Sequence, residues 1–310
     1  MVGRGRSWIG VVCLAAAAAI WGGMYVVSAA VLRVIPAWIL LELRFLLACT
    51  ALAAVAARMG QLPIAKRDLL QMALLGVVGY TGSIGMQFLG TAQSGAAMGA
   101  LITSASPALI SGFAYWWLRE SITGMDLLGL CMGLGGVAIV VLPTLGANTL
   151  QSSTFSGALW LVGAALLWGA YTVLSRRATM RYASLTVTFW SSLFGALFTL
   201  PLALIEWEHT GWILPSSGAV WAGVLYLGIV STTLAFFLWN KGFEYLPQSG
   251  GSLFFLLQPV VGTLLGWALL GESLTPSFLI GGLLIVASVF VGILPQRNQQ
   301  RQKARGSDPT

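Results

Sequence analysis

The strongest constraint on the fold is a series of ten apolar runs, each roughly 20 residues long and separated from the next by a short polar connector. A run of that length crosses a bilayer as an α-helix, because backbone exposed to lipid must pair its polar groups internally. Only 8% of the 310 residues are charged and 57% are hydrophobic, which no soluble globule of this size could bury. The sequence therefore predicts an all-α integral membrane protein. The predicted spans are about 8–32, 37–57, 69–89, 95–118, 125–143, 155–175, 184–205, 218–240, 249–270 and 276–294.

Basic residues indicate how these spans are oriented. If the N-terminus is cytoplasmic and the spans alternate, fourteen of the 16 basic residues fall on the cytoplasmic side, Arg33 falls outside, and Arg44 stays within a span. This positive-inside bias predicts that both termini are cytoplasmic and that residues 296–310 form a basic cytoplasmic tail. Orientation thus accounts for the net charge of +7, and nucleic acid is excluded as a partner. The fourteen cytoplasmic residues are Arg4, Arg6, Arg58, Lys66, Arg67, Arg119, Arg176, Arg177, Arg181, Lys241, Arg297, Arg301, Lys303 and Arg305.

The two halves of the chain are related by a sparse repeat. The phrases ESITGMDLLG from Glu120 and ESLTPSFLIG from Glu272 are similar and stand 152 residues apart. Earlier in each half, WGGMYVVS from Trp21 aligns with WGAYTVLS from Trp168 at an offset of 147. Other pairs at the offset of 152 are Gly90 with Gly242, Gly99 with Gly251, and Pro107 with Pro259.

Each repeat contains five spans, an odd number, so the second repeat must enter the membrane from the opposite side. The sequence therefore predicts two inverted five-helix repeats, residues 1–146 and 147–295, with ten transmembrane helices in all. Inverted repeats are typical of secondary transporters, which hold substrate near the bilayer midplane between the halves.

The chain resembles the drug/metabolite transporter superfamily and, within it, the EamA-type exporters. The motifs that carry the resemblance are IWGGMYVVS from Ile20, LRFLLA around Arg44, WWLRESIT after Pro107 and LLGESLT after Pro259, in an order that extends to about Pro295. The likeness is greatest to exporters of aromatic and other neutral amino acids. The resemblance implies a multi-pass exporter of small metabolites in a bacterial-type inner (plasma) membrane, and it leaves the substrate open.

Aromatic and uncharged polar residues recur near the middle of several spans. Trp21 and Trp168 each stand about 13 residues, or roughly 20 Å, into their spans. Polar groups are costly at that depth, so they indicate a cavity or interhelical hydrogen bonds; for the tryptophans, plain core packing is the alternative. The predicted substrate-cavity residues are Trp21, Tyr25, Tyr80, Ser83, Gln87, Trp168, Tyr171, Thr232, Trp239, Phe254 and Gln258.

Two prolines stand at equivalent places in the repeats, and each removes a backbone hydrogen bond within a span. Glycines with small-xxx-small spacing lie close to them and let helices approach. Hinge bending and ordinary helix packing both explain this pattern. The predicted hinge or packing residues are Gly95, Gly99, Pro107, Pro259 and Gly262.

The predicted cavity is apolar and aromatic with a few uncharged donors, which suits a small neutral solute. Arg44 is interpreted as structural, bonded to neighbouring backbone or to Glu42. Because no carboxylate lies near the midplane, uncoupled export is favoured over proton coupling.

These features predict an alternating-access exporter of small neutral metabolites, with aromatic and other neutral amino acids as the first candidates. A drug/metabolite or nucleotide-sugar-like transporter of the same superfamily is the alternative. An intramembrane enzyme is disfavoured because no nucleophile–base pair or metal-ligand spacing is present. We expect a small-molecule substrate and a lipid bilayer as partners and no cofactor or metal; the sequence does not indicate the oligomeric state.

Overall fold

The computed structural model describes most of the chain, and every element in the described part is helical. Six helical segments there are long and apolar enough to cross a membrane, and three shorter apolar helices accompany them. The chain is therefore an all-helical, multi-pass membrane protein. The described residues are 7–60, 62–106, 109, 113, 124–142, 153–243, 254, 256–288 and 291.

In the first half of the chain, the first two helices lie within two residues of the predicted spans, and the third predicted span is composite. Its middle is π-helical and is continuous with α-helix on both sides. The elements are α1 (Ser7–Val31), α2 (Ala37–Arg58), η1 (Lys66–Asp68), α3 (Leu69–Leu75), the π-helical η2 (Gly76–Ile84), α4 (Gly85–Ser94), α5 (Ala96–Thr103) and α7 (Gly124–Val141).

The second half repeats this pattern, including a π-helical segment in its third span. The elements are α8 (Ser153–Thr179), α9 (Ser184–Thr210), α10 (Gly218–Leu225), the π-helical η4 (Tyr226–Leu234), α11 (Ala235–Phe243), α13 (Leu257–Leu270) and a last apolar helix, Pro276–Ser288. Two α-helices here, α8 and α9, extend several residues beyond the predicted spans. Pro107, Glu120 and the predicted tail 296–310 lie outside the described residues.

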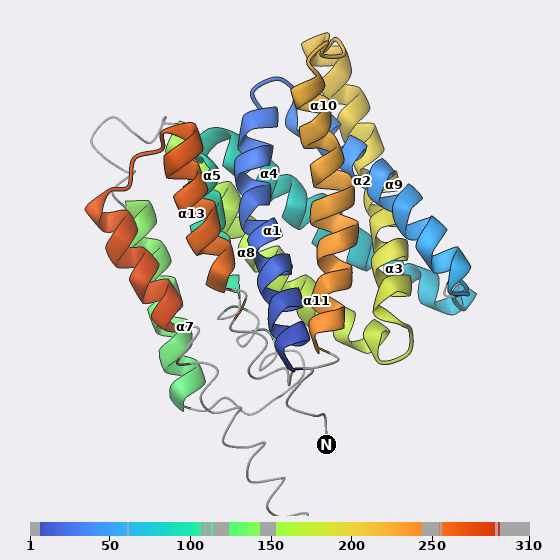
Figure 1. Ribbon diagram of the computed structural model, residues 1–310, viewed down its shortest axis with the longest axis horizontal. Helices are drawn as coiled ribbons and strands as arrows, with labels where there is room; N and C mark the ends of the chain where they lie inside the picture. The colour runs from blue at the N-terminus through green and yellow to red at the C-terminus, as the bar shows by residue number, and fades with distance from the viewer. Residues whose placement is uncertain are drawn as a thin grey trace, which may run out of the picture.

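The helices stand side by side, and equivalent connections lie at opposite ends of the bundle. The chain passes from α1 to α2 at the top of the view and from α8 to α9 at the bottom (Figure 1). Hence α1 and α8, which carry the two related tryptophan motifs, run in opposite directions.

Close glycine contacts between the halves are reciprocal. A Cβ placed on Gly76 would lie 2.6 Å from Phe194 Cβ of α9, and one placed on Gly228 would lie 2.6 Å from Leu47 Cβ of α2. Gly228 follows Gly76 by 152 residues and Phe194 follows Leu47 by 147, the two offsets found in the sequence. The same contact therefore occurs twice, with the roles of the halves exchanged.

A second reciprocal pair of contacts involves the equivalent glycines Gly90 and Gly242. Gly90 of α4 packs against Gly157 and Leu161 of α8, and Gly242 of α11 packs against Leu14 and Gly10 of α1. These residues are again related by the offsets of 152 and 147. Absence of a side chain lets the helix backbones approach, which is how membrane helices gain van der Waals contact without a hydrophobic driving force.

Two helix N-termini of the first half are capped by carboxylates of the second half. Glu206 accepts hydrogen bonds from the backbone N–H groups of Trp38 (2.8 Å) and Ile39 (3.0 Å) at the start of α2. Glu272 accepts from Ala96 (2.6 Å) and Ala97 (2.7 Å) at the start of α5. The first N–H groups of a helix have no partner within it, and an anion there also meets the positive end of the helix dipole.

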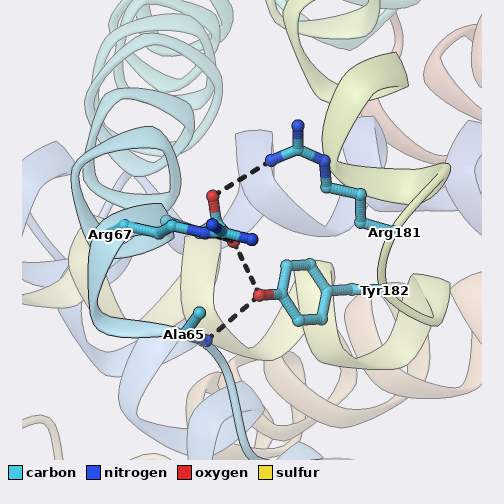
Figure 2. A network of polar contacts seen from close by, with 5 residues as sticks. Ala65, Arg67, Arg181 and Tyr182 are labelled. Atoms are coloured by element: carbon cyan, nitrogen blue, oxygen red, sulfur yellow. Dashed lines mark hydrogen bonds and ion pairs between the residues drawn. The ribbon is translucent and has the colours of Figure 1, made fainter.

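At the other end of the bundle, a polar network joins the two halves around Asp68. Its carboxylate accepts hydrogen bonds from the Tyr182 hydroxyl (2.7 Å) and from Arg181 Nη1 (3.3 Å), while Arg67 Nε lies 4.0 Å away. The Tyr182 hydroxyl in turn accepts from the backbone N–H of Ala65 at 3.1 Å. Figure 2 shows Arg181 and Tyr182 reaching from the α8–α9 connection to the segment before α3.

Substituting the reciprocal glycines tests whether this close packing is essential. In Gly90→Ala and Gly242→Ala, the new Cβ would lie 2.6 Å from Leu161 Cγ and 2.5 Å from Leu14 Cγ, so each variant should lose about 1–3 kcal/mol of stability. Thermal unfolding of the detergent-solubilised protein measures the loss. Gly135→Ala is the control, because its nearest neighbour is 3.7 Å away and alanine favours helix. Equal melting temperatures in all three variants would contradict the packing argument.

Candidate functional site

A cavity of about 70 Å³ lies between the two halves and is lined by helices from both. Its walls come from α1, α2, η2, α4 and α5 of the first half and from α8, α11 and α13 of the second, together with Ser106 just after α5. Trp21 and Trp168 face it from near the middle of α1 and α8. The lining residues are Trp21, Met24, Tyr25, Arg44, Ser83, Ile84, Gln87, Thr103, Ser106, Ala164, Ala165, Trp168, Phe236 and Gln258.

The residues predicted for the cavity separate into four groups within the described chain. Those on the cavity wall are Trp21, Tyr25, Ser83, Gln87, Trp168 and Gln258. Those in contact with wall residues are Trp239, whose ring centre is 5.2 Å from that of Trp21, Tyr171 at 5.1 Å from Trp168, and Thr232, which binds Arg44. Tyr80 lies one residue further from the wall, with its ring centre 5.8 Å from that of Tyr171. Phe254 is half-buried and is not part of the wall.

Arg44 lies on the cavity wall, and our interpretation of it as bonded to backbone or to Glu42 is wrong. Its Nε donates to the Thr232 hydroxyl at 3.1 Å, across the interface between α2 and η4. Among the residues that the structure describes, Glu42 makes no ion pair with it, because the two side chains are two positions apart on one helix and point to different faces. An ionisable residue within a span is by default a functional candidate, and that signal was present in the sequence.

A directed chain of hydrogen bonds joins three helices at one side of the cavity. Gln258 Nε2 of α13 donates to the Tyr25 hydroxyl of α1 at 3.1 Å, and that hydroxyl lies 2.5 Å from Thr103 Oγ1 of α5. Because Thr103 gives its own proton to the Gly99 carbonyl (2.7 Å), Tyr25 must be the donor to Thr103. The polar atoms in this chain therefore satisfy one another.

The π-helical segments supply unusual backbone positions at the cavity. In η4, the hydroxyls of Ser231 (2.8 Å) and Thr232 (2.9 Å) both donate to the Leu227 carbonyl, and the Ser231 carbonyl accepts the indole N–H of Trp21 at 2.9 Å. In η2, the Ser83 hydroxyl donates to the Ala164 carbonyl of α8 at 2.8 Å. Helices with i→i+5 hydrogen bonding are rare overall, but those that occur are often found at functional sites. These two segments were not predicted from the sequence.

Two of the five predicted hinge or packing residues, Gly99 and Gly262, serve close packing in the described structure. Gly99 is closely approached by Tyr25, and Gly262 lies against Ala100. Gly95, with φ +90°, separates α4 from α5, a conformation that favours glycine. Pro259 is the third residue of α13, where its missing N–H would have no helical partner in any case, so it marks the start of the helix and not a bend within it.

No cluster of three or more His, Cys, Asp or Glu side chains in the described ranges is placed to hold a metal ion.

Comparison with known proteins then identifies the family. The model of the EamA-like transporter family matches residues 8–142 and 155–294 of this chain. The chain belongs to the EamA-like transporter family.

Relatives in this family agree on transport. The chain is 28% identical over 293 residues to the uncharacterized transporter YetK of Bacillus subtilis (strain 168), which covers 92% of this chain and 87% of that protein. It is 29% identical over 237 residues to the uncharacterized inner membrane transporter YicL of Salmonella typhimurium, covering 76% of this chain and 77% of the relative.

A third relative carries a substrate in its name. This probable terminal-alkyne amino-acid exporter of Streptantibioticus cattleyicolor is 26% identical over 251 residues, covering 80% of this chain and 81% of that protein. A solved structure, described only as the crystal structure of a protein, has a TM-score of 0.61 at 23% identity and covers 96% of this chain and 99% of its own. That likeness supports the fold.

Membership in the family confirms the predicted superfamily and class of protein. The chain is a membrane transporter for a small-molecule substrate and not an enzyme. Its two separate matches to the family model agree with a repeated architecture.

The Trp21 indole can be tested by a change that keeps most of the ring volume. Trp21→Phe removes the hydrogen bond to Ser231 and should cost about 0.5–1.5 kcal/mol while leaving a folded protein. Trp21→Ala should cost about 3–5 kcal/mol. We expect slower flux or a changed substrate preference in Trp21→Phe, measured in vesicles beside the melting temperature. Trp160→Phe is the control, because Trp160 is 39% exposed and is not part of the cavity wall. Equal flux in both Phe variants would remove Trp21 from the pathway.

Proposed function

We propose that the protein is an alternating-access exporter of small neutral metabolites, with aromatic and other neutral amino acids as its first candidate substrates. The observation that carries the proposal is the central cavity between the halves, with Trp21, Trp168 and Phe236 as apolar wall and Tyr25 and Gln258 as polar groups. Such a lining accepts an apolar side chain along the rings and a few hydrogen bonds at fixed positions.

Two findings support alternating access by inverted repeats. Equivalent connections lie at opposite ends of the bundle (Figure 1), and glycine contacts occur in reciprocal pairs. In such an arrangement the two halves exchange conformations around a fixed central site. The name of the Salmonella relative supports placement in a bacterial inner membrane, and the name of the Streptantibioticus relative supports an amino-acid cargo.

A nucleotide-sugar cargo is less well supported by the described cavity. Its phosphates would bring more than one negative charge, and Arg44 is the cationic residue on the wall. The cavity also has no carboxylate on its described wall, which disfavours polyvalent cations.

Transport by the purified protein tests this proposal. Proteoliposomes containing only this chain should carry labelled neutral amino acids, aromatic ones included, faster than protein-free liposomes. Because no carboxylate is described on the cavity wall, a solute gradient alone should drive the flux, and an imposed pH gradient should not concentrate the solute. Flux of nucleotide sugars or cationic drugs with none of amino acids would contradict the proposal.

The inverted topology is tested by labelling two equivalent positions. Arg33, in the connection after α1, and Met180, after α8, are separated by the offset of 147, and both are exposed. In a chain whose Cys13, Cys49 and Cys131 are replaced by alanine, a membrane-impermeant maleimide should label Arg33→Cys from outside and Met180→Cys from the cytoplasm. Labelling of both from the same side would show parallel repeats.

A further inference from the structure

Arg44 is a buried cation that has no acidic partner among the residues that the structure describes. Its side chain is 3% exposed and lines the cavity from α2. Nε donates to Thr232, and the guanidinium carbon lies 5.6 Å from the centre of the Phe88 ring. Nη1 is buried and has no hydrogen-bond partner. In the described part of the chain, ion pairs form around Asp68 and none involves Arg44.

A buried guanidinium without a counter-charge costs free energy unless a ligand supplies that charge and the remaining hydrogen bonds. A guanidinium stays protonated in proteins, and a buried charge is normally paired and fully hydrogen-bonded. Here Nε is held by Thr232 and the guanidinium carbon lies over the Phe88 ring, so the position of the group is fixed while Nη1 has no hydrogen-bond partner.

A second unpaired donor lines the same cavity. Gln87, the residue before Phe88, also lines the cavity and is 8% exposed, and its Nε2 is buried without a partner. On the same wall, the hydroxyls of Tyr25, Thr103 and Ser83 already have hydrogen-bond partners. Both unpaired groups on the wall are donors, so a ligand that pairs with them would offer acceptor oxygens.

We propose that Arg44 and Gln87 bind the carboxylate of the transported solute; this inference rests on the proposed export function and names its substrate class. Guanidinium N–H groups match the geometry and charge of a carboxylate. One guanidinium balances one negative charge, whereas a phosphate monoester carries about −1.5 to −2 at neutral pH. The site therefore selects a monocarboxylate whose apolar or aromatic remainder lies along Trp21, Trp168 and Phe236.

The first test compares acids with their amides on the wild-type chain. The probes are acetate, 3-phenylpropionate, L-leucine, L-phenylalanine and L-tryptophan, each with its carboxamide, and phenethylamine. Thermal unfolding of the detergent-solubilised protein and its tryptophan fluorescence report binding, since Trp21 and Trp168 line the cavity. We expect one or more carboxylates to raise the melting temperature and to shift the fluorescence, while the amides and the amine do neither. Equal effects of acid and amide, or no effect of any carboxylate, would overturn the proposal.

The second test removes the donors. In Arg44→Met the carboxylate should bind roughly tenfold more weakly or worse, because a charge-assisted hydrogen bond and its charge are lost, and Gln87→Leu should weaken it less. Arg33→Met removes an exposed arginine away from the cavity and should bind as the wild type does. Unchanged affinity in Arg44→Met would also overturn the proposal. If Arg44→Met fails to fold, the comparison of acid with amide in the wild type decides.

Flux measurements separate this inference from the export function. If binding requires both the carboxylate and Arg44 but the bound solute shows no flux, the anion site is supported and export of that solute is contradicted. If amino-acid flux is the same in Arg44→Met and in the wild type, export is supported and the anion site is contradicted.

Discussion

Lipid offers no hydrogen-bond partners, and this one constraint governs how polar atoms are paired in the described spans. Many hydroxyls in the described spans donate to a carbonyl three or four residues earlier in their own helix, as Ser28 does to Tyr25 and Thr172 to Trp168. Other polar groups pair across helices around the cavity. Several buried side-chain atoms in the described ranges have no hydrogen-bond partner, and those on the cavity wall are Arg44 Nη1 and Gln87 Nε2. The energetic cost of leaving these two donors unpaired is not offset within the protein.

Close backbone approach is the second requirement, and glycine meets it in both halves. Gly76 and Gly90 face α9 and α8, while Gly228 and Gly242 face α2 and α1, so each repeat packs on the other through equivalent residues. Consequently α1 packs beside α11 and α13 of the second half, as α8 packs beside α4 and α5 of the first. Helices of the two halves therefore alternate around the cavity, whose wall includes Trp21 and Trp168.

Hydropathy and charge were enough to predict the helical membrane fold, because span length and the cost of exposed backbone depend on composition alone. Depth along a helix predicted Trp21 and Trp168 for the cavity, and the structure has both on its wall. Polarity within a span predicted Gln258, which also lies on the wall. The π-helical segments could not be predicted, since their hydrogen bonding depends on contacts with other helices. Thr232 was assigned to the wall and instead supports Arg44, because periodicity gives a face of a helix and not its distance from a neighbouring one.

Packing in this protein is close to symmetric, whereas the chemistry of the cavity is not. At the offset of 147, the residue equivalent to Arg44 is Ser191, a fully buried residue of α9 that brings no charge. In an inverted-repeat transporter the two halves can exchange conformations through symmetric contacts. A contact that one half forms after the exchange is equivalent to one that the other half formed before it. A solute with one carboxylate and one apolar side chain is itself asymmetric, so it needs a cation from one half only. A second arginine at position 191 would add a buried charge that such a solute could not balance.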